Sequence, residues 1–349
     1  MNKHTKMETT VNVAQQWQDD DYAPRQKAID ETLQAPNRWT GPALNHTLDR
    51  WMQQFTPEAL EQWIGSASGK DDPPTVAVLH GGDEPLAGFR AAIGVWALGY
   101  SYVGVLSEAS PSLLPAFARD VSEEGGRSID FAPADEALSR ADAVVADPET
   151  RVESPAAACD REGIPEQNQL LRSKTFSVGV VDGNESEEEM DRFAEDMLLY
   201  EGGGRRRLAV LWAPDEHAPD AYLEAMARFR GFFPAHDDTP GALQMQQAFL
   251  EARDEPHAYA DGLEFLVSRG DPTPQKAGHV RWAEYDALDA VNRWWTDHRD
   301  EVYAVIARRG LHDRCPTDWP LRTPGGVHVP PLDDEEGQRT IAFLRSLTD

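Results

Sequence analysis

Three glycines followed by three arginines form the stretch of this 349-residue sequence that is best suited to chemistry. Gly202, Gly203 and Gly204 stand between a predicted amphipathic helix and a predicted strand, and residues 205–207 are all arginine. Glycines let a backbone approach a ligand closely, and arginines grip phosphates or carboxylates through paired hydrogen bonds. A flexible connection between packed elements, with arginines paired to nearby acids, explains the same residues. The sequence leaves both interpretations open.

The order of elements around the glycines excludes the common phosphate-binding loops. Residues 176–181 form a β-branched run that ends at Asp182-Gly183, and Asn184 or Ser186 can cap the helix that follows. We expect that helix to end at Glu201. In phosphate-binding glycine loops the strand comes first, so that a helix N-terminus faces the anion. Here the order is helix, glycines, strand, which is neither a P-loop nor a dinucleotide fingerprint.

Four further side chains outside the glycine loop are candidates for chemistry. Asp83 lies in the loop after the first predicted strand, where a carboxylate is either functional or turn-forming. His312 and Cys315 are three residues apart, which is conceivable for a nucleophile pair, although no local charge lowers the thiol pKa. His80 follows a buried strand and is expected to be structural. Because Cys159 is the only other cysteine, we expect neither a disulfide framework nor a metal site.

The net charge of −28 narrows the class of partner. Asp and Glu number 61 against 33 Lys and Arg, and the excess is spread along the chain. This composition is typical of a halophilic protein, whose acidic surface is screened by salt, and it weighs against nucleic-acid binding. Residues 1–20 lack the apolar core of a signal peptide, and no apolar run reaches spanning length. We therefore expect a cytoplasmic protein without a membrane span.

Hydrophobic periodicity predicts an α/β protein. The predicted strands are residues 75–79, 102–106, 129–132, 143–146, 176–181, 208–212, 263–267, 279–282 and 302–306. The predicted helices are residues 86–98, 112–121, 187–201, 219–233, 242–253, 287–295 and 339–347, while residues 148–169 are expected to be irregular. Strands that alternate with helices indicate a doubly wound parallel sheet. Such a sheet binds ligands outside the carboxyl ends of its strands, here near residues 81–85 and Ser107.

Four stretches resemble a known family across about residues 39–344. They are HGGDEPLAGFRAAIGVWALGYSYVGVLS, SRADAVVAD, SVGVVDGNESEEEMDRFAEDMLLYEGGGRRRLAVLWAP and GGVHVPPLDDEEGQRTIAFL. They look like the acyl-CoA reductases related to the fatty-acyl reductase of bacterial bioluminescence, within the aldehyde dehydrogenase superfamily. The third stretch is the most specific, because relatives share its strand, acidic turn and helix, and glycine loop.

The resemblance implies a fold, a reaction and a cofactor. The fold would have two lobes: residues 39–172 a nucleotide-binding lobe with a helical lead-in, and residues 173–322 a catalytic-type α/β lobe. Residues 1–38 would be a polar, partly disordered segment, and residues 323–349 a tail that packs back on the first lobe. The implied reaction is NADPH-dependent reduction of a fatty acyl-CoA to an aldehyde through an acyl-cysteine.

Four positions depart from the family pattern. Arg205 stands where the family has its nucleophilic cysteine, and Asp83 stands where an asparagine donates to the oxyanion, which a carboxylate would repel. Val105 replaces a lysine that contacts the cofactor ribose, although Ser107 remains. Asp147 begins a turn that adds negative charge near the expected cofactor phosphates and includes a proline without an N–H donor.

Together these changes predict a non-catalytic descendant of an acyl-CoA reductase, because an arginine cannot form a thioester. Activity would survive if Cys159 or Cys315 moved into the site. The alternative functions are therefore a degenerate NADP-dependent reductase and a binding or scaffold protein. The second would hold a fatty acyl ligand, a protein partner or another copy of the chain.

Overall fold

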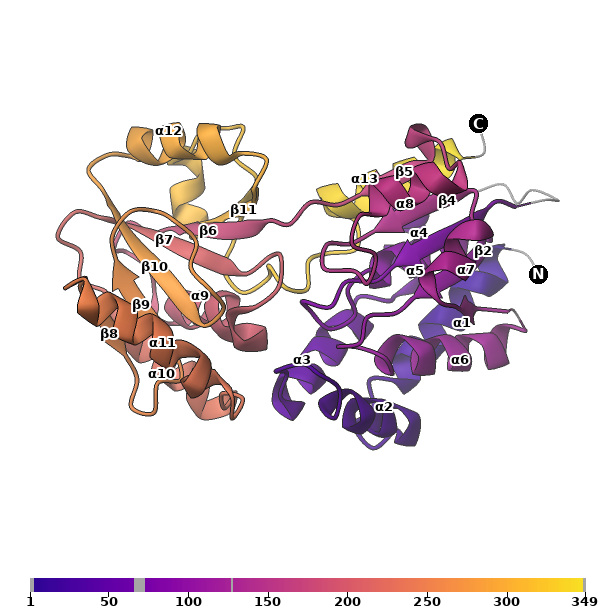
Figure 1. Cartoon of the computed structure of the whole chain (residues 1–349), viewed down its shortest axis with the longest axis horizontal. Helices are drawn as coiled ribbons and strands as arrows, with labels where there is room; N and C mark the ends of the chain where they lie inside the picture. The colour runs from indigo at the N-terminus through magenta and orange to yellow at the C-terminus, as the bar shows by residue number, and fades with distance from the viewer. Residues whose placement is uncertain (1–2, 66–72, 127, 348–349) are drawn as a thin grey trace. The chain divides into compact units, whose positions relative to one another are not determined.

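The computed structural model describes residues 3–65, 73–126 and 128–347, which form two compact units. Unit 1 comprises Met1–Asn37, Leu44–Ser173 and Val329–Asp349, and unit 2 comprises Arg38–Ala43 and Lys174–His328. Each unit has its own β-sheet (Figure 1). This architecture confirms the expected α/β fold with two lobes.

Unit 1 is built on a five-stranded parallel sheet. Its strands are β1 (Thr75–Leu79), β2 (Ser101–Val105), β3 (Asp130–Phe131), β4 (Ala143–Ala146) and β5 (Gln169–Leu171), in the order β3-β2-β1-β4-β5. Successive side chains of a strand point to opposite faces of the sheet. Nearly all residues of β1 and β4 are buried, so helices or loops cover both faces. Ala77 and Leu79 of β1 belong to a cluster with α7 (Ala134–Ser139) and α8 (Pro155–Glu162). Helix α5 (Phe89–Leu98) also packs against β1 and β2.

Helix α8 and strand β5 correct the prediction that residues 148–169 are irregular. Pro155 occupies the first turn of α8, where its missing N–H costs nothing, and Gly163 ends the helix in the left-handed region at φ 74°. Ala158 and Cys159 are the buried residues of this short helix. Two inward-facing residues are too few to give a recognisable helical period.

The N-terminal segment also differs from the expectation of a polar, partly disordered stretch. Helices α1 (Lys3–Gln16) and α2 (Ala23–Leu33) cover most of it. Trp17 is fully buried, its ring packs edge-on against Phe117 of α6 (Leu113–Gly125), and its Nε1 donates to Asp120 at 2.8 Å. Polar residues such as Thr10 are buried beside the apolar ones, which obscures the helical pattern in the sequence.

The remaining helices of unit 1 surround α5. They are α3 (Gly41–Met52), whose first three residues belong to unit 2, α4 (Pro57–Ile64) and α13 (Glu335–Ser346). Helix α5 begins three residues later than predicted, because Leu86 at φ 57° and Gly88 at φ 76° cannot belong to a right-handed helix. The Arg90 side chain of α5 forms ion pairs with Asp334 and Glu336, which ties α13 to α5.

Unit 2 contains a seven-stranded sheet. Its strands are β6 (Phe176–Val180), β7 (Leu208–Pro214), β8 (His257–Tyr259), β9 (Leu266–Arg269), β10 (His279–Tyr285), β11 (Val302–Ile306) and β12 (Leu321–Arg322). The order is β12-β11-β6-β7-β10-β9-β8, and only the pairing of β8 with β9 is antiparallel. The helices are α9 (Glu187–Leu198), α10 (Asp220–Phe232), α11 (Thr239–Ala252) and α12 (Leu288–His298).

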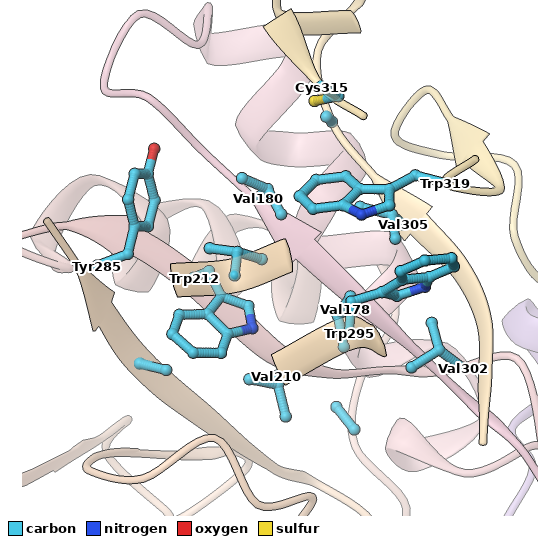
Figure 2. Packing of buried hydrophobic residues seen from close by; sticks show 14 of the residues in the cluster. Val178, Val180, Val210, Trp212, Tyr285, Trp295, Val302, Val305, Cys315 and Trp319 are labelled. Atoms are coloured by element: carbon cyan, nitrogen blue, oxygen red, sulfur yellow. The ribbon is translucent and has the colours of Figure 1, made fainter. Parts of the chain in front are cut away.

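One face of the unit 2 sheet carries a large hydrophobic cluster. Val178, Val210 and Val305 from three neighbouring strands meet Trp295 of α12 and Trp319 (Figure 2). Trp294 packs against the same cluster, so both Trp294 and Trp295 contribute to the core. On α9, Ser186 provides the predicted cap: its hydroxyl accepts from Glu189 N at 3.2 Å, and the Glu189 carboxylate accepts from Ser186 N at 2.8 Å.

Two helical glycines test how tightly the helices pack. A Cβ added to Gly337 of α13 would lie 1.9 Å from the backbone oxygen of Leu332, so Gly337→Ala requires the backbone to move. We expect it to lower the free energy of unfolding by about 2 kcal/mol or more. Gly231 of α10 is exposed with nothing within 4 Å of the added Cβ.

Gly231→Ala is therefore the matched control, and we expect it to raise stability by about 0.5–1 kcal/mol. Urea denaturation followed by circular dichroism measures both variants. Equal stabilities for the two alanine variants would contradict the packing described for Gly337.

Candidate functional site

In unit 1, the loops that follow β1, β2 and β4 pack directly on one another. Gly82 N donates to the Glu149 carbonyl at 3.1 Å. A Cβ added to Gly82 would lie 2.4 Å from Ser107 Oγ, and one added to Gly81 would lie 2.4 Å from Pro148 O. These two glycines therefore allow loop-to-loop contact at the carboxyl edge of the sheet.

The four predicted site residues of unit 1 all lie at this carboxyl edge. Asp83 is partly buried, and its carboxylate folds back so that Oδ1 is 3.2 Å from a Cβ position built on Gly81. Ser107 is buried and its Oγ accepts from Ala109 N at 3.1 Å. Val105 is buried in the apolar cluster of the sheet. Asp147 accepts from Arg172 at 2.6 Å.

The Asp147–Arg172 ion pair belongs to a larger polar network. The Arg172 guanidinium also contacts Glu336 at 3.0 Å and donates to Thr340 Oγ1 at 2.8 Å. Both acceptors lie on α13, more than 160 residues after Arg172. The sequence analysis could not predict this network, because the three residues show no local spacing pattern. The arrangement ties the end of β4 to the C-terminal helix through one largely buried guanidinium, whose side chain is 9% exposed.

His80 has the structural role that its position predicts. Its Nδ1 lies 2.7 Å from the Ala87 carbonyl and its Nε2 lies 2.7 Å from the Tyr102 hydroxyl. Because a carbonyl only accepts, Nδ1 carries the proton and Nε2 accepts from Tyr102. Burial lowers the pKa of His80, so the neutral ring is favoured.

In unit 2, the chain reaches the glycines through an unusual left-handed turn. Helix α9 ends at Leu198, three residues earlier than predicted, and a 3₁₀ turn spans Leu199–Gly202. Tyr200 at φ 57° and Glu201 at φ 59° both adopt the left-handed region, and Gly202 follows at φ 65°. Two consecutive non-glycine residues in this region cost about 1–3 kcal/mol each, so other contacts must hold them.

A buried ion pair holds the turn. The Glu201 carboxylate receives hydrogen bonds from Arg230 Nη1 at 2.9 Å and Arg230 Nη2 at 3.3 Å, and the Thr239 hydroxyl donates to it as well. All three side chains are buried. Arg230 also donates to the Glu264 carbonyl at 3.1 Å, so the network joins α10, α11 and the segment before β9.

The glycine segment is tightly packed at Gly202, whereas Gly203 and Gly204 are partly exposed. A Cβ added to Gly202 would lie 2.6 Å from Gly278 N, so this glycine permits contact between two backbones. Arg207 donates to the Gly202 carbonyl at 3.0 Å and also to the Gln275 carbonyl. Burial lowers the pKa of Arg207. The segment is therefore a fixed connection that sets the direction of β7.

Arg205 and Arg206 leave this segment toward an aromatic ring. Their guanidinium carbons lie 5.5 and 5.4 Å from the centre of the Tyr303 ring. Thr175 Oγ1 donates to the Arg205 carbonyl at 2.9 Å, and Ser177 Oγ donates to the Arg206 carbonyl at 2.8 Å. Both arginines are buried, so their side chains are fixed at the start of β7.

Each of the two cysteines lies in an apolar cluster of its own unit. Cys159 belongs to the apolar cluster of unit 1, and Cys315 to the cluster of unit 2 that Figure 2 shows. Burial raises the pKa of both thiols. His312 Nε2 contacts the Ala307 carbonyl at 3.0 Å, so that nitrogen donates to a carbonyl.

An ionic cluster at the other end of β6 was missed by the sequence analysis. Asp182 forms a bidentate pair with Arg308, with both contacts at 2.8 Å, and Arg314 approaches the same carboxylate at 3.3 Å. Hydrogen bonds from Arg308 lower the pKa of Asp182 to about 2. The sequence indicated only the end of a strand at Asp182. Its partners, Arg308 and Arg314, follow β11 and are more than 120 residues away in the sequence.

A second polar group missed by the sequence analysis lies between β9, β10 and α11. Ser268 Oγ is 2.6 Å from His279 Nε2, and His279 Nδ1 is 2.9 Å from Gln246 Oε1. Ser268 and His279 are both buried, and burial lowers the pKa of His279 to about 3. The amide oxygen accepts from Nδ1–H and leaves Nε2 to accept from the serine. The group is a closed core network of neutral side chains.

Metal binding and membrane insertion find no support in the described part of the chain. No three His, Cys, Asp or Glu residues there are grouped to hold a metal ion. Within the same residues, no helix combines the length and apolar character that crossing a bilayer requires.

Comparison with known proteins places the fold. No family model matches the sequence, and no curated protein matches it either. Solved structures are similar: an indole-3-acetaldehyde dehydrogenase variant from P. syringae in complex with NAD⁺ has a TM-score of 0.65 at 10% identity, covering 90% of this chain and 74% of that one.

Two further dehydrogenases agree with this result. An NAD-dependent benzaldehyde dehydrogenase from Corynebacterium glutamicum has a TM-score of 0.66 at 11% identity, covering 98% of this chain and 84% of that one. A betaine aldehyde dehydrogenase variant from Staphylococcus aureus has a TM-score of 0.65 at 13% identity, covering 93% and 75%. The chain therefore has the aldehyde dehydrogenase fold, as the resemblance predicted.

Removal of the buried carboxylate tests the left-handed turn. Glu201→Gln leaves the Arg230 charge buried without its ionic partner, and we expect unfolding free energy to fall by about 3–5 kcal/mol. Asp191→Asn is the matched control, since Asp191 pairs with Arg228 at the surface and should change stability by less than about 1 kcal/mol. Urea denaturation measures both. A Glu201→Gln variant as stable as Asp191→Asn would show that other contacts hold the turn.

The Asp182 cluster predicts a dependence on pH. Because the folded pKa of about 2 lies below the ordinary 3.8, Asp182 stabilises the fold above about pH 4 and loses this effect as the pH falls toward 2. We expect Asp182→Asn to lower stability by about 2 kcal/mol at neutral pH, with the difference from wild type shrinking over that window.

Denaturant titrations from pH 7 to pH 2 measure this difference. Asp130→Asn, which breaks a surface pair with Arg140, is the control and should show no such pH window. A constant difference between wild type and Asp182→Asn at all pH values would contradict the assignment.

Proposed function

We propose that this chain is a non-catalytic binding protein of the acyl-CoA reductase type, which has kept the fold and lost the acyl-cysteine step. One observation carries the proposal: the residue after Gly204 is an arginine buried against Tyr303, while both cysteines lie in apolar clusters. Acyl transfer from a thioester to the protein needs a thiolate. The guanidinium of Arg205 has no sulfur atom and cannot form the thioester.

The residues at the carboxyl edge of the unit 1 sheet also support the proposal that the chain does not catalyse the reduction. The similar dehydrogenase structure in complex with NAD⁺ suggests a nicotinamide cofactor. The resemblance of the sequence to acyl-CoA reductases suggests NADP. The residues present fit such a dinucleotide poorly. The Gly82 N–H is bonded to a carbonyl, Val105 offers no polar side-chain atom to a ribose, and Pro148 has no N–H to donate to a phosphate.

A protein of this fold that has lost its reaction can still bind a ligand or a partner. A fatty acyl ligand, a protein partner or a second copy of the chain could bind to such a chain without any chemical step. The acid-rich composition supports a place in the cytoplasm of a salt-rich cell, where screening reduces repulsion among 61 carboxylates.

The second candidate function is the reaction itself, NADPH-dependent reduction of a fatty acyl-CoA to an aldehyde. The observation that favours it is the near-complete match to enzyme structures, which extends over 90–98% of the chain. It requires a nucleophile other than Arg205, and the buried thiols of Cys159 and Cys315, with pKa values raised by burial, are poorly suited.

Mass spectrometry of the intact protein distinguishes the two functions. After incubation with a long-chain acyl-CoA in high salt, we expect no acyl adduct, and after addition of NADPH no aldehyde above a buffer blank. Arg205→Cys is the informative variant. It places a thiol after the glycines, and we expect turnover to stay absent because the oxyanion position is still Asp83.

A related reductase with an intact cysteine serves as the positive control for both assays. Aldehyde formed by the wild-type chain would overturn the proposal. An adduct on Arg205→Cys without aldehyde would be consistent with it, because the thioester could form while reduction fails.

A further inference from the structure

The outer face of helix α11 in unit 2 combines exposure with a lack of charge. Six of its exposed residues recur at spacings of three and four, which places them in one stripe along the helix. We call this set the α11 stripe, and its members are Gly241, Gln244, Met245, Ala248, Phe249 and Ala252. Glu251 is the one charged residue among the 14 of α11, whereas 27% of the whole chain is charged.

The two large side chains of the stripe are apolar and open to solvent. Met245 is 74% exposed and Phe249 is 56% exposed. Within the described part of the chain, four of the five large hydrophobic side chains with high exposure lie between residues 232 and 259, in or close to α11 in the sequence. Methionine and aromatic residues are enriched where proteins contact one another, and gathered apolar surface marks such contacts.

The opposite face of α11 packs within unit 2. Leu243 and Leu250 form a cluster with Leu266 of β9, against which the helix packs (Figure 1). The Gln246 amide accepts from His279 at 2.9 Å. The helix is therefore held in place without its outer stripe. Covering that stripe by a partner would remove additional apolar surface from water.

Four exposed carboxylates border the stripe at its two ends. They are Asp237 and Asp238 before the helix, Glu251 in its last turn and Asp254 after it. Arg253 is the one Lys or Arg in residues 236–255, all of which the structure describes. Its guanidinium lies 4.1 Å from the centre of the Phe249 ring and 3.5 Å from Glu255. The border of the stripe thus carries more negative than positive charge.

We propose that the α11 stripe binds an amphipathic helix of another protein, whose own apolar stripe is flanked by lysines or arginines. The apolar side chains of that helix would cover Met245 and Phe249, as in other complexes formed by amphipathic helices. The small residues of the stripe let two helix axes approach closely. The basic flanks would face the acidic border, and such charge complementarity selects one partner over others.

Charge and shape favour this partner over three others. A second copy would bring the same acidic border and a net charge of −28 against this chain, and like charges across an interface are unfavourable. The surface of an anionic membrane repels the same carboxylates. Small ligands bind in concave pockets, whereas the outer face of a helix is convex.

The proposed surface does not depend on the loss of acyl transfer. It needs no thiol, and a chain that still reduced acyl-CoA could carry it as well. A binding measurement therefore tests the α11 stripe separately from the reaction.

Binding of a synthetic peptide to the full chain tests the proposal. The probe is a fluorescently labelled amphipathic helix of leucine, alanine and lysine, about 18 residues or about 27 Å long. Fluorescence anisotropy measures its binding at the lowest KCl concentration at which circular dichroism shows the native fold. We expect saturable binding to the wild-type chain. Binding should be at least about tenfold weaker in Met245→Gln and in Phe249→Gln, because each variant removes an apolar contact.

Leu33→Gln is the matched control, since Leu33 is 39% exposed and lies on α2 in unit 1. It should bind the peptide like the wild type. Melting curves show whether each variant folds. The double variant Asp238→Asn/Glu251→Gln should bind the peptide several-fold more weakly, and added KCl should reduce this difference because salt screens exposed charges. A peptide with glutamate in place of every lysine should bind at least about tenfold more weakly than the lysine peptide.

Three results would overturn the inference. One is the absence of saturable binding, or equal affinity for the lysine and glutamate peptides. Another is peptide binding by folded Met245→Gln and Phe249→Gln that equals the binding of Leu33→Gln, which would show a general attraction to an acidic chain. The third is a different occupant of the stripe: self-association in sedimentation equilibrium, or binding to phosphatidylglycerol vesicles, that Phe249→Gln abolishes.

Discussion

The buried ion pair between Glu201 and Arg230 is the interaction on which unit 2 depends most. It holds a turn that two non-glycine residues would otherwise avoid, because left-handed backbone is unfavourable for side chains with a Cβ. That turn sets where Gly202 meets Gly278 and where β7 begins. Arg205 and Arg206, which lie close to the Tyr303 ring, follow shortly after this turn in the chain.

The two units use arginine in the same way. In unit 1, Arg172 joins Asp147 to α13, and Arg90 joins α5 to the same helix. In unit 2, Arg308 joins Asp182 to the strand beside it. A chain with many carboxylates gains specific partners from a planar guanidinium, which can satisfy several acceptors at once. The guanidiniums of Arg205, Arg206 and Arg322 also lie close to one aromatic ring, that of Tyr303.

Different residues determine the fold and the chemical reactivity of a chain of this kind. The aldehyde dehydrogenase fold rests on apolar alternation in the strands and on packed helices, and identities of 10–13% to the solved relatives are enough to keep it. Reactivity depends on single side chains at loop positions, where one substitution removes a thiol or adds a charge. A chain can therefore keep the first while changing the second.

The sequence by itself determined most of the strands, the Ser186 cap and the structural role of His80, because these follow from local periodicity, capping chemistry and neighbouring residues. The two-lobed architecture followed from the resemblance to a known family. The tertiary structure alone decided the left-handed turn at Tyr200 and Glu201, the helices of the N-terminal segment and the arginine cluster around Tyr303. Each of these depends on contacts between residues far apart in the chain. Such contacts leave no spacing pattern in a single sequence.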